Sequence, residues 1–253
     1  MARVFLVKGR ALSDSYVNSP KPIELPRMRT QFLSGVRQAL GHAETIAPAA
    51  RPERRDAVVR EVSANDPKRI DRWIRCAAGN GMSVERVAAD GVVAAIEKTL
   101  TARKSRRVML NCLTWPVEPL AQALNAAGMQ VHRWTEPSCA RDVFECDTAV
   151  TDCRYGLADT GALMVWSDAG FGRSSTLTVN LHIVILSADK ILGDLVDAMV
   201  MLGRDTAGKL PSNVVIINGP SKTSDIEMNL VTGVHGPKFL SAIVVDPPPR
   251  NSA

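Results

Sequence analysis

The sequence predicts an α/β fold: a mainly parallel sheet flanked by helices, preceded by an N-terminal helical arm. From about residue 85 onward, stretches with apolar residues at helical spacing alternate with short β-branched runs, a pattern typical of α/β domains. The runs at 181–186 and 213–217 are almost continuously apolar, as expected of strands buried in a parallel sheet. With 45% hydrophobic and 23% charged residues, the composition excludes a wholly disordered or fibrous chain.

The N-terminal quarter is predicted to be an extended arm followed by one helix and a polar connector. Residues 1–26 lack periodicity and contain three prolines, and residues 42–66 have the composition of a polar connector. Between them, apolar residues recur at helical spacing and a glycine can end the helix: Met28, Phe32, Leu33, Val36, Leu40 and Gly41. We therefore divide the chain into the arm and helix (1–65), the α/β domain (66–246) and a flexible tail (247–253).

The α/β domain is predicted to begin with a helix, because Asp66 is a good N-cap and Pro67 suits the first helical position. Further helices are expected from about Val87 to Leu100, over 116–127 and from Leu192 to Leu202. Strands are expected over 107–110, 129–134, 149–150, 162–166, 181–186, 213–217 and 239–245. Residues 151–163 indicate a strand, a turn and a strand, with Asp159 at the turn.

The charge distribution along the chain is uneven. Residues 1–110 carry 21 Lys and Arg against 11 Asp and Glu, whereas residues 111–253 carry 10 against 15. Acidic residues interleave the basic ones, such as Glu53 and Asp56, which flank Arg54 and Arg55. A solvated surface explains this interleaving best, and it disfavours nucleic-acid binding. Docking of an acidic partner on the basic half remains an alternative.

The five cysteines fit neither a metal site nor a disulfide framework. None occurs as Cys-x-x-Cys, and the last three recur every seven residues, which is no zinc or iron–sulfur spacing: Cys76, Cys112, Cys139, Cys146 and Cys153. An odd count without a signal-peptide core indicates free thiols. No His, Asp and Glu spacing suggests metal ligands, and no apolar run is long enough for a membrane helix. We therefore expect a soluble cytoplasmic protein with no metal site and no cofactor of its own.

Residues 216–227 have the character of a ligand-binding turn. A predicted buried strand leads into a turn at Gly219, and hydroxyl groups and Lys222 follow before a predicted short helix. Backbone N–H groups at a helix start favour an anion, and Lys222 adds a positive charge. Residues 224–227 equally fit a capping box, whose acidic side chains satisfy the helix start and repel an anion. Both interpretations stand, although ligands usually bind at the carboxyl ends of strands in an open α/β sheet.

Three further loops carry groups suited to bind or transform an anion, and each contains glycine: 233–238 with His235 and Lys238, 156–163 with Asp159, and 170–175 with Arg173 and Ser174. His182, at the head of a buried strand, is instead expected to be a core histidine. Asp159 begins an Asp-Thr-Gly tripeptide like that of aspartic proteases, but that chemistry needs two carboxylates and the chain has no second copy. Together the loops indicate a small acidic or phosphorylated ligand at the carboxyl edge of the sheet.

Four segments, in this order, resemble motifs of the LUD domain family, which includes lactate-utilisation protein C. They are 158–162, 181–184, 219–227 and 233–238, and the last two are long and specific. The predicted N-terminal helix, with Phe32-Leu33 and residues 36–41, is also similar to the family's opening. Three positions depart from the family pattern: Asp159 and Phe239 each replace a glutamate, and Ser224 replaces an alanine.

The resemblance implies a fold like that of the sugar-phosphate isomerase and CoA-transferase group. It implies a role in the oxidation of L-lactate to pyruvate, beside partner proteins that hold the iron–sulfur clusters, with a small anionic ligand bound by this chain. The alternative is an enzyme similar to a CoA-transferase or a formyltetrahydrofolate cyclo-ligase, with Asp159 as nucleophile or base.

The resemblance and the loop chemistry together select the candidate residues. We expect Asp159 and His235 to be catalytic. The expected ligand-binding residues are Thr160, Gly161, Arg173, Ser174, Gly219, Ser221, Lys222, Thr223, Asp225, Gly236 and Lys238. In the enzyme hypothesis, Lys222 and Arg173 hold the anion and His235 assists the reaction.

Overall fold

The computed structural model describes residues 25–41, 62–63, 66–134, 140–168, 170–223 and 231–247. The chain divides into two compact units, Met1–Arg54 and Arg55–Ala253. The described part of the first unit is helix α1 (Leu25–Ala39) with the turn that follows it, which confirms the predicted N-terminal helix. Apolar side chains on α1 and in this turn are exposed, among them Met28, Phe32 and Leu40.

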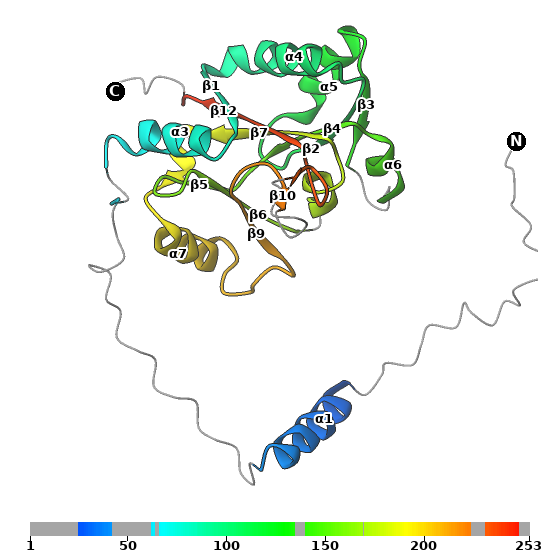
Figure 1. Cartoon of the computed structure of the whole chain (residues 1–253), viewed down its shortest axis with the longest axis vertical. Coiled ribbons are helices and arrows are strands. Elements are labelled where there is room, and N and C mark those ends of the chain that lie inside the picture. The colour runs from blue at the N-terminus through cyan, green and yellow to red at the C-terminus, as the bar shows by residue number, and fades with distance from the viewer. Residues whose placement is uncertain are drawn as a thin grey trace, which may run out of the picture. The chain divides into compact units, whose positions relative to one another are not determined.

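The second unit is built on a six-stranded sheet in which every strand pairs in parallel (Figure 1). Its strands, in spatial order, are β1 (Ser83–Val87), β12 (Phe239–Val245), β7 (Leu181–Ser187), β4 (Thr148–Asp152), β2 (Arg107–Asn111) and β3 (Gln130–Arg133). β4 and β7 are buried along almost their whole length, because each lies between two other strands and beneath helices. The predicted α/β fold with a mainly parallel sheet is therefore confirmed.

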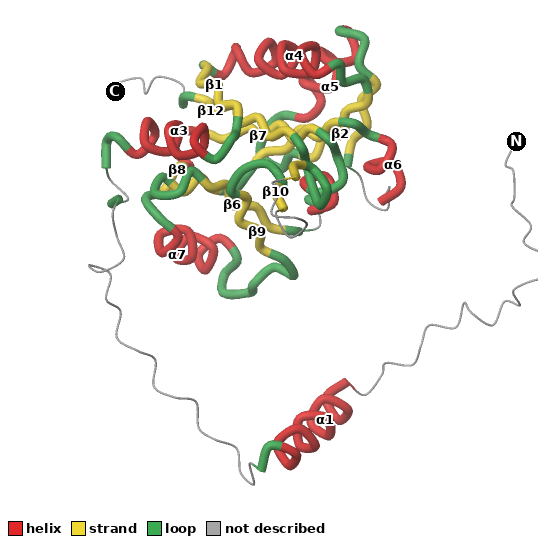
Figure 2. The backbone as a smooth tube through the Cα atoms, in the orientation of Figure 1, coloured by secondary structure: helices red, strands yellow, loops and turns green. Residues whose placement is uncertain are grey.

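Helices cover both faces of this sheet (Figure 2). One face carries α4 (Val92–Arg103) and α5 (Val117–Ala126), and the other carries α3 (Arg69–Gly79) and α6 (Ala140–Glu145). Along β7, Ile183 packs in the layer of α4 and α5, whereas Val184 packs in the layer of α3. Successive side chains of a strand point to opposite faces of the sheet, so the strands contribute to two separate apolar layers.

A second, four-stranded sheet packs in the layer of α3. Its strands, in spatial order, are β8 (Ile191–Leu192), β5 (Tyr155–Leu157), β6 (Ala162–Trp166) and β9 (Val214–Ile217). β5 and β6 form an antiparallel hairpin, which confirms the predicted strand, turn and strand. Helix α7 (Leu195–Asp205) covers this sheet with Ala198 and Leu202. β10 (Lys222–Thr223) and β11 (Val231–Thr232) form a separate antiparallel pair.

One predicted strand and one predicted helix differ from the structure. The strand expected at 213–217 is β9, but it pairs antiparallel with β6 at an edge of the second sheet. It is therefore only half-buried, and Ile216 is 42% exposed. The helix expected from Val87 begins at Val92, because residues 83–87 form β1. β1 is an edge strand whose polar Glu85 interrupts the apolar pattern, as is common at sheet edges.

The helix boundaries differ by a few residues from those predicted. The helix expected from Asp66 begins at Arg69, and the one expected from Leu192 begins at Leu195. The N-cap of α7 is Asp194, whose carboxylate accepts the Asp197 N–H at 2.9 Å. Helix α6 was outside the predicted elements, since its six residues are too few for a clear helical period.

The turn of the β5–β6 hairpin packs tightly against α3. A Cβ placed on Gly161 would lie 2.2 Å from the Ala77 backbone nitrogen, and the φ of Gly161 is +72°. Next to this turn, the Trp73 indole N–H donates to the Ala162 carbonyl at 2.9 Å. The second sheet is therefore fixed to α3 by contacts that leave no room for a side chain at position 161.

This packing predicts that Gly161→Ala is far more destabilising than an alanine at a comparable but open position. Gly128 provides the control, because its φ is +84° and no atom lies within 4 Å of a Cβ placed there. We expect Gly128→Ala to lower the free energy of unfolding by about 1 kcal/mol, the cost of the backbone conformation alone. Gly161→Ala should lower it by about 3 kcal/mol or more, since α3 must also move. Urea unfolding measures both values, and equal losses would contradict the tight contact.

Candidate functional site

The structure gathers three of the predicted loops into what we call the amino-edge cluster: residues 159–161, 219–222 and 233–238, with Asn80. Asn80 follows α3, and its side-chain amide donates to the Thr160 carbonyl and to Asn218 Oδ1, both at 2.7 Å. Its own carbonyl accepts a hydrogen bond from Lys222 Nζ at 2.9 Å. A Cβ placed on Gly219 would lie 2.6 Å from the same carbonyl oxygen. Asn80 therefore joins the hairpin turn to the segment 219–222.

The segments 219–222 and 233–238 are joined to each other directly. The Ser221 N–H donates to the Pro237 carbonyl at 2.9 Å, and the Gly233 N–H donates to the Ser221 carbonyl at 3.0 Å. A Cβ placed on Gly236 would lie 3.3 Å from the Ser221 Cβ, so these backbones are close together. The two most specific motifs of the sequence thus form one hydrogen-bonded unit.

This cluster lies at the amino edge of the main sheet, whereas the sequence predicted the carboxyl edge. Residues 233–238 lead directly into β12 at Phe239, and Asn80 precedes the start of β1 at Ser83. The prediction is wrong because β9, which precedes Gly219, belongs to the second sheet and runs antiparallel to β6. Its end therefore does not point to the carboxyl edge of the parallel strands.

The basic side chains of the amino-edge cluster are open to solvent. Lys222, His235 and Lys238 are all exposed. Lys222 Nζ is bound by a neutral carbonyl, and Lys238 Nζ lies 5.6 Å from the centre of the Phe239 ring. Within the described part of the chain, neither lysine takes part in an ion pair. Their charge is therefore not neutralised by a described carboxylate.

The two catalytic candidates are not joined by a contact among the described residues. Asp159 lies in the hairpin turn, where its carboxylate accepts the Thr160 hydroxyl at 3.1 Å and its N–H donates to the Gly193 carbonyl at 3.0 Å. His235 lies in the loop before β12. An Asp159–His235 pair therefore stays a prediction. Thr223 belongs to β10, and Asp225 lies outside the described residues.

Arg173 and Ser174 lie in a different part of the second unit. They begin a short 3-10 helix (Arg173–Thr176) that packs on β4 and α6, and no described contact joins it to the amino-edge cluster. The Asn111 amide donates to the Gly172 carbonyl at 2.9 Å, and a Cβ on Gly172 would overlap the Trp134 ring at 2.0 Å. Packing against Trp134 therefore explains this glycine.

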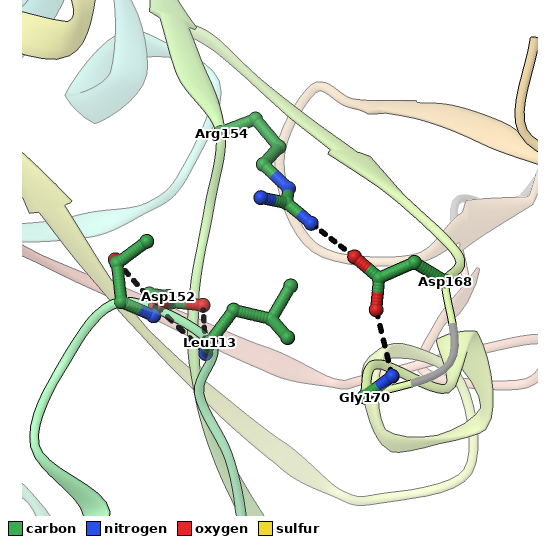
Figure 3. A network of polar contacts seen from close by, with 6 residues as sticks. Leu113, Asp152, Arg154, Asp168 and Gly170 are labelled. Carbon is green, nitrogen blue, oxygen red and sulfur yellow. Dashed lines mark hydrogen bonds and ion pairs between the residues drawn. The ribbon is translucent and has the colours of Figure 1, made fainter. Parts of the chain in front are cut away.

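At the carboxyl edge, the structure contains a polar network that the sequence did not indicate (Figure 3). Asp152 ends β4 and is buried. Its carboxylate accepts the Leu113 N–H at 3.0 Å, the Thr114 hydroxyl at 2.7 Å and the Trp115 N–H at 3.1 Å. These hydrogen bonds hold the loop that follows β2 against the end of the neighbouring strand β4.

Arg154, two residues after Asp152, reaches the other way, toward Asp168 (Figure 3). The Arg154 guanidinium forms an ion pair with the Asp168 carboxylate and lies 4.7 Å from the centre of the Trp166 ring. The second carboxylate oxygen of Asp168 accepts the Gly170 N–H at 2.8 Å. Arg154 thus lies between an aromatic ring and an acidic turn.

Two hollows open beside Arg154. One measures about 300 Å³ and is lined by Trp115, Tyr155 and Ile185 among others, and the other measures about 660 Å³. Arg154 and Asp205 line both. The signal that points to this place is an acidic residue at the end of a buried strand followed by a basic one, at the sheet edge where ligands usually bind.

Three cysteines of this unit are held as neutral thiols. Burial raises the pKa of Cys146 to about 11 and raises the pKa of Cys112 and Cys153 further. The four described cysteines form no disulfide. Among the described residues, no group of three or more His, Cys, Asp or Glu side chains is placed to hold a metal ion. The described helices include none that could cross a membrane.

His182 is a core residue, as the sequence predicted. It is fully buried in β7, and its Nε2 lies 2.9 Å from the Thr151 hydroxyl on β4. Its Nδ1 has no hydrogen-bond partner among the described residues. Burial lowers the pKa of His182 to about 3, so the ring is neutral at physiological pH.

The fold and the loops define an α/β protein with a parallel six-stranded sheet and hydrogen-bonded loops at its amino edge. The sequence profile of the LUD domain matches residues 70–245, and the chain belongs to this family. It is 28% identical to lactate utilization protein C of Halalkalibacterium halodurans over 231 residues, covering 86% of this chain and 97% of that relative. It is 30% identical to the uncharacterized protein YkgG of Escherichia coli over 233 residues, covering 86% and 98%.

The fold is shared with a solved structure. The crystal structure of a DUF162 family protein from Deinococcus radiodurans matches with a TM-score of 0.55 and 22% identity. The match covers 70% of this chain and 96% of that one. At this level of identity the similarity concerns the fold.

The buried His182 predicts a loss of stability in acid. Between the ordinary pKa of histidine and about 3, the unfolded chain binds a proton that the folded chain does not. Stability should therefore fall as the pH drops below about 6.5, with His182 contributing about 1.4 kcal/mol per pH unit. The free energy of unfolding, measured with urea between pH 7 and 4, should change less steeply with pH for His182→Gln than for wild type. The control, His132→Gln on β3, should keep the wild-type slope, and a parallel curve for His182→Gln would contradict the burial argument.

Proposed function

We propose that this protein is a subunit of a lactate-utilisation system that oxidises L-lactate to pyruvate, that it acts with iron–sulfur partner proteins, and that it binds a small anionic ligand. The observation that carries the proposal is the similarity to lactate utilization protein C, which extends over 97% of that relative's length. Because the match covers almost the whole relative, we assign to this chain the role of that entire protein rather than the role of one domain.

The chemistry of the amino-edge cluster supports the anionic ligand. Lys222 is held by a neutral carbonyl, so its charge has no competing carboxylate in the described contacts. Ser221, the residue before Lys222, is hydrogen-bonded through its backbone to the loop that ends in Lys238. Lysine binds carboxylates and phosphates as a point charge. We therefore assign the ligand to the space beside these two segments.

The partner proteins follow from the electrons that the reaction releases. Oxidation of lactate to pyruvate yields two electrons, which require a carrier. The cysteine spacings of this chain do not match those of iron–sulfur ligands. We therefore assign electron transfer to iron–sulfur clusters on partner proteins and ligand binding to this chain. We place the system in the cytoplasm, where cysteines stay reduced.

The ligand can be tested by thermal denaturation of the purified protein with L-lactate, pyruvate and inorganic phosphate. A ligand at a hundredfold excess over its Kd should stabilise the wild-type protein by about 2.7 kcal/mol. We expect Lys222→Ala to weaken binding at least about tenfold, which is about 1.4 kcal/mol. Lys98→Ala, which removes an exposed lysine of α4 that pairs with Glu85 of β1, is the control and should leave binding unchanged. Equal binding by both variants would refute the assigned site.

The cellular role is tested separately by growth and copurification. Deletion of the gene should prevent growth on L-lactate as sole carbon source and leave growth on glucose intact. The wild-type gene should restore growth, and the tagged protein from lactate-grown cells should copurify with iron–sulfur proteins. Normal growth of the deletion strain on L-lactate would rule out the proposed role, whatever the outcome of the binding experiment.

A further inference from the structure

We propose a second binding site at the carboxyl edge of the main sheet, in which Arg154 binds the carboxylate of an organic acid and an aromatic or apolar body of that acid fills the adjoining hollow. This site is separate from the amino-edge cluster and does not rest on the proposed function. Three features support it: the place of Arg154 in the fold, the exchangeable partner of its guanidinium, and the lining of the hollow.

Arg154 lies where the connections of the sheet diverge. β2 leads by α5 to β3 on one side, whereas β4 leads by the second sheet to β7 on the other side. Between such strands the two loops separate and leave a crevice, which is the usual ligand site of an open α/β sheet. Asp152 holds the loop 113–115 at one wall of this crevice, and Arg154 begins the opposite wall (Figure 3). The backbone at Arg154 is fixed, since its N–H donates to the Met164 carbonyl at 2.9 Å.

The partner that Arg154 has in this structure is itself a carboxylate. Asp168 lies on an exposed turn, and its side chain is 37% exposed against 24% for Arg154. A planar guanidinium matches the shape of any carboxylate, and the Arg154 guanidinium also makes a cation–π contact with the Trp166 ring. A ligand carboxylate can therefore replace Asp168 like for like. Asp168 would then return to solvent while its turn stays closed by the bridge between Asp168 and Phe171.

The smaller hollow combines an apolar wall with two cations and three carboxylates, so an anion there must be held by Arg154 itself, and the apolar wall selects the body of the ligand. Its acidic residues are already hydrogen-bonded: Asp152 to the loop 113–115, Asp189 to the Ser187 hydroxyl, and Asp205 to the Tyr155 hydroxyl at 2.7 Å. Lys190 adds a positive charge, with its Nζ 5.7 Å from the centre of the Tyr155 ring. The remaining surface includes Trp115, Tyr155 and Ile185. A volume of about 300 Å³ is that of a small-molecule pocket and exceeds what a three-carbon acid fills.

The ligand class is tested by calorimetric titration of the full chain with three probes. Phenyllactate carries both the carboxylate and the ring, L-lactate lacks the ring, and benzyl alcohol lacks the carboxylate. We expect phenyllactate to bind at least tenfold more tightly than either of the others in this site. No binding of phenyllactate at millimolar concentration, or equal binding of benzyl alcohol, would overturn the proposal.

Two substitutions that break the same ion pair give the decisive comparison. Arg154→Gln removes the receptor and should weaken phenyllactate binding at least tenfold. Asp168→Asn removes the competitor and should tighten binding about threefold or more. If the pair were merely structural, both substitutions would change binding in the same direction, and that result would overturn the proposal. Glu118→Gln, which breaks the exposed pair of Glu118 with Arg133 on β3, is the matched control.

The second site is also separable from the amino-edge cluster. Lys222→Ala should leave phenyllactate binding within twofold of wild type, because residue 222 lies at the opposite edge of the sheet. Loss of phenyllactate binding in Lys222→Ala together with normal binding in Arg154→Gln would assign the ligand to the amino edge and refute the second site. Failure of the growth experiment on lactate would leave this result unaffected.

Discussion

The contact between the β5–β6 turn and the end of α3 is the constraint on which the arrangement of the second unit depends. Packing on the main sheet fixes α3 through Trp73 and Ala77, and Gly161 lets the hairpin turn rest directly on the helix backbone. Asn80, at the end of the same helix, then binds both the turn and Lys222. One helix end therefore positions the second sheet and the loops before β12 together. Segments that are far apart in the sequence become one cluster because each contacts this helix end or its neighbour.

The parallel sheet could be predicted because its central strands are buried on both faces, and a strand in that position has an apolar run that the sequence displays. β9 carries a similar run of β-branched residues yet lies at an antiparallel edge, since such residues suit either kind of strand. Local sequence therefore predicts the strand but not its partner. Likewise, the motifs around Ser221 and His235 could be recognised in the sequence, whereas their mutual hydrogen bonds and their place at the amino edge could not.

The crevice at Arg154 could not be predicted for a different reason. Its ion-pair partner Asp168 lies beyond β6, and Asp205 lies at the end of α7, so no short motif contains the group. Asp152 is the last residue of the buried strand β4. The structure shows that it satisfies the N–H groups of the loop after β2, which is a structural task. The positive charge that remains available to a ligand is that of Arg154, two residues further along the chain.

The two edges of the sheet hold their cations in different ways, and this difference has consequences for binding. Lys222 is bound by a neutral carbonyl, so an arriving anion has no described carboxylate to displace. Arg154 is bound by Asp168, so an anion there must exchange with an internal competitor. An exchange of this kind gains little from charge alone, because one carboxylate replaces another. Selectivity at Arg154 must therefore come from the body of the ligand against the aromatic wall, whereas at Lys222 charge itself contributes directly.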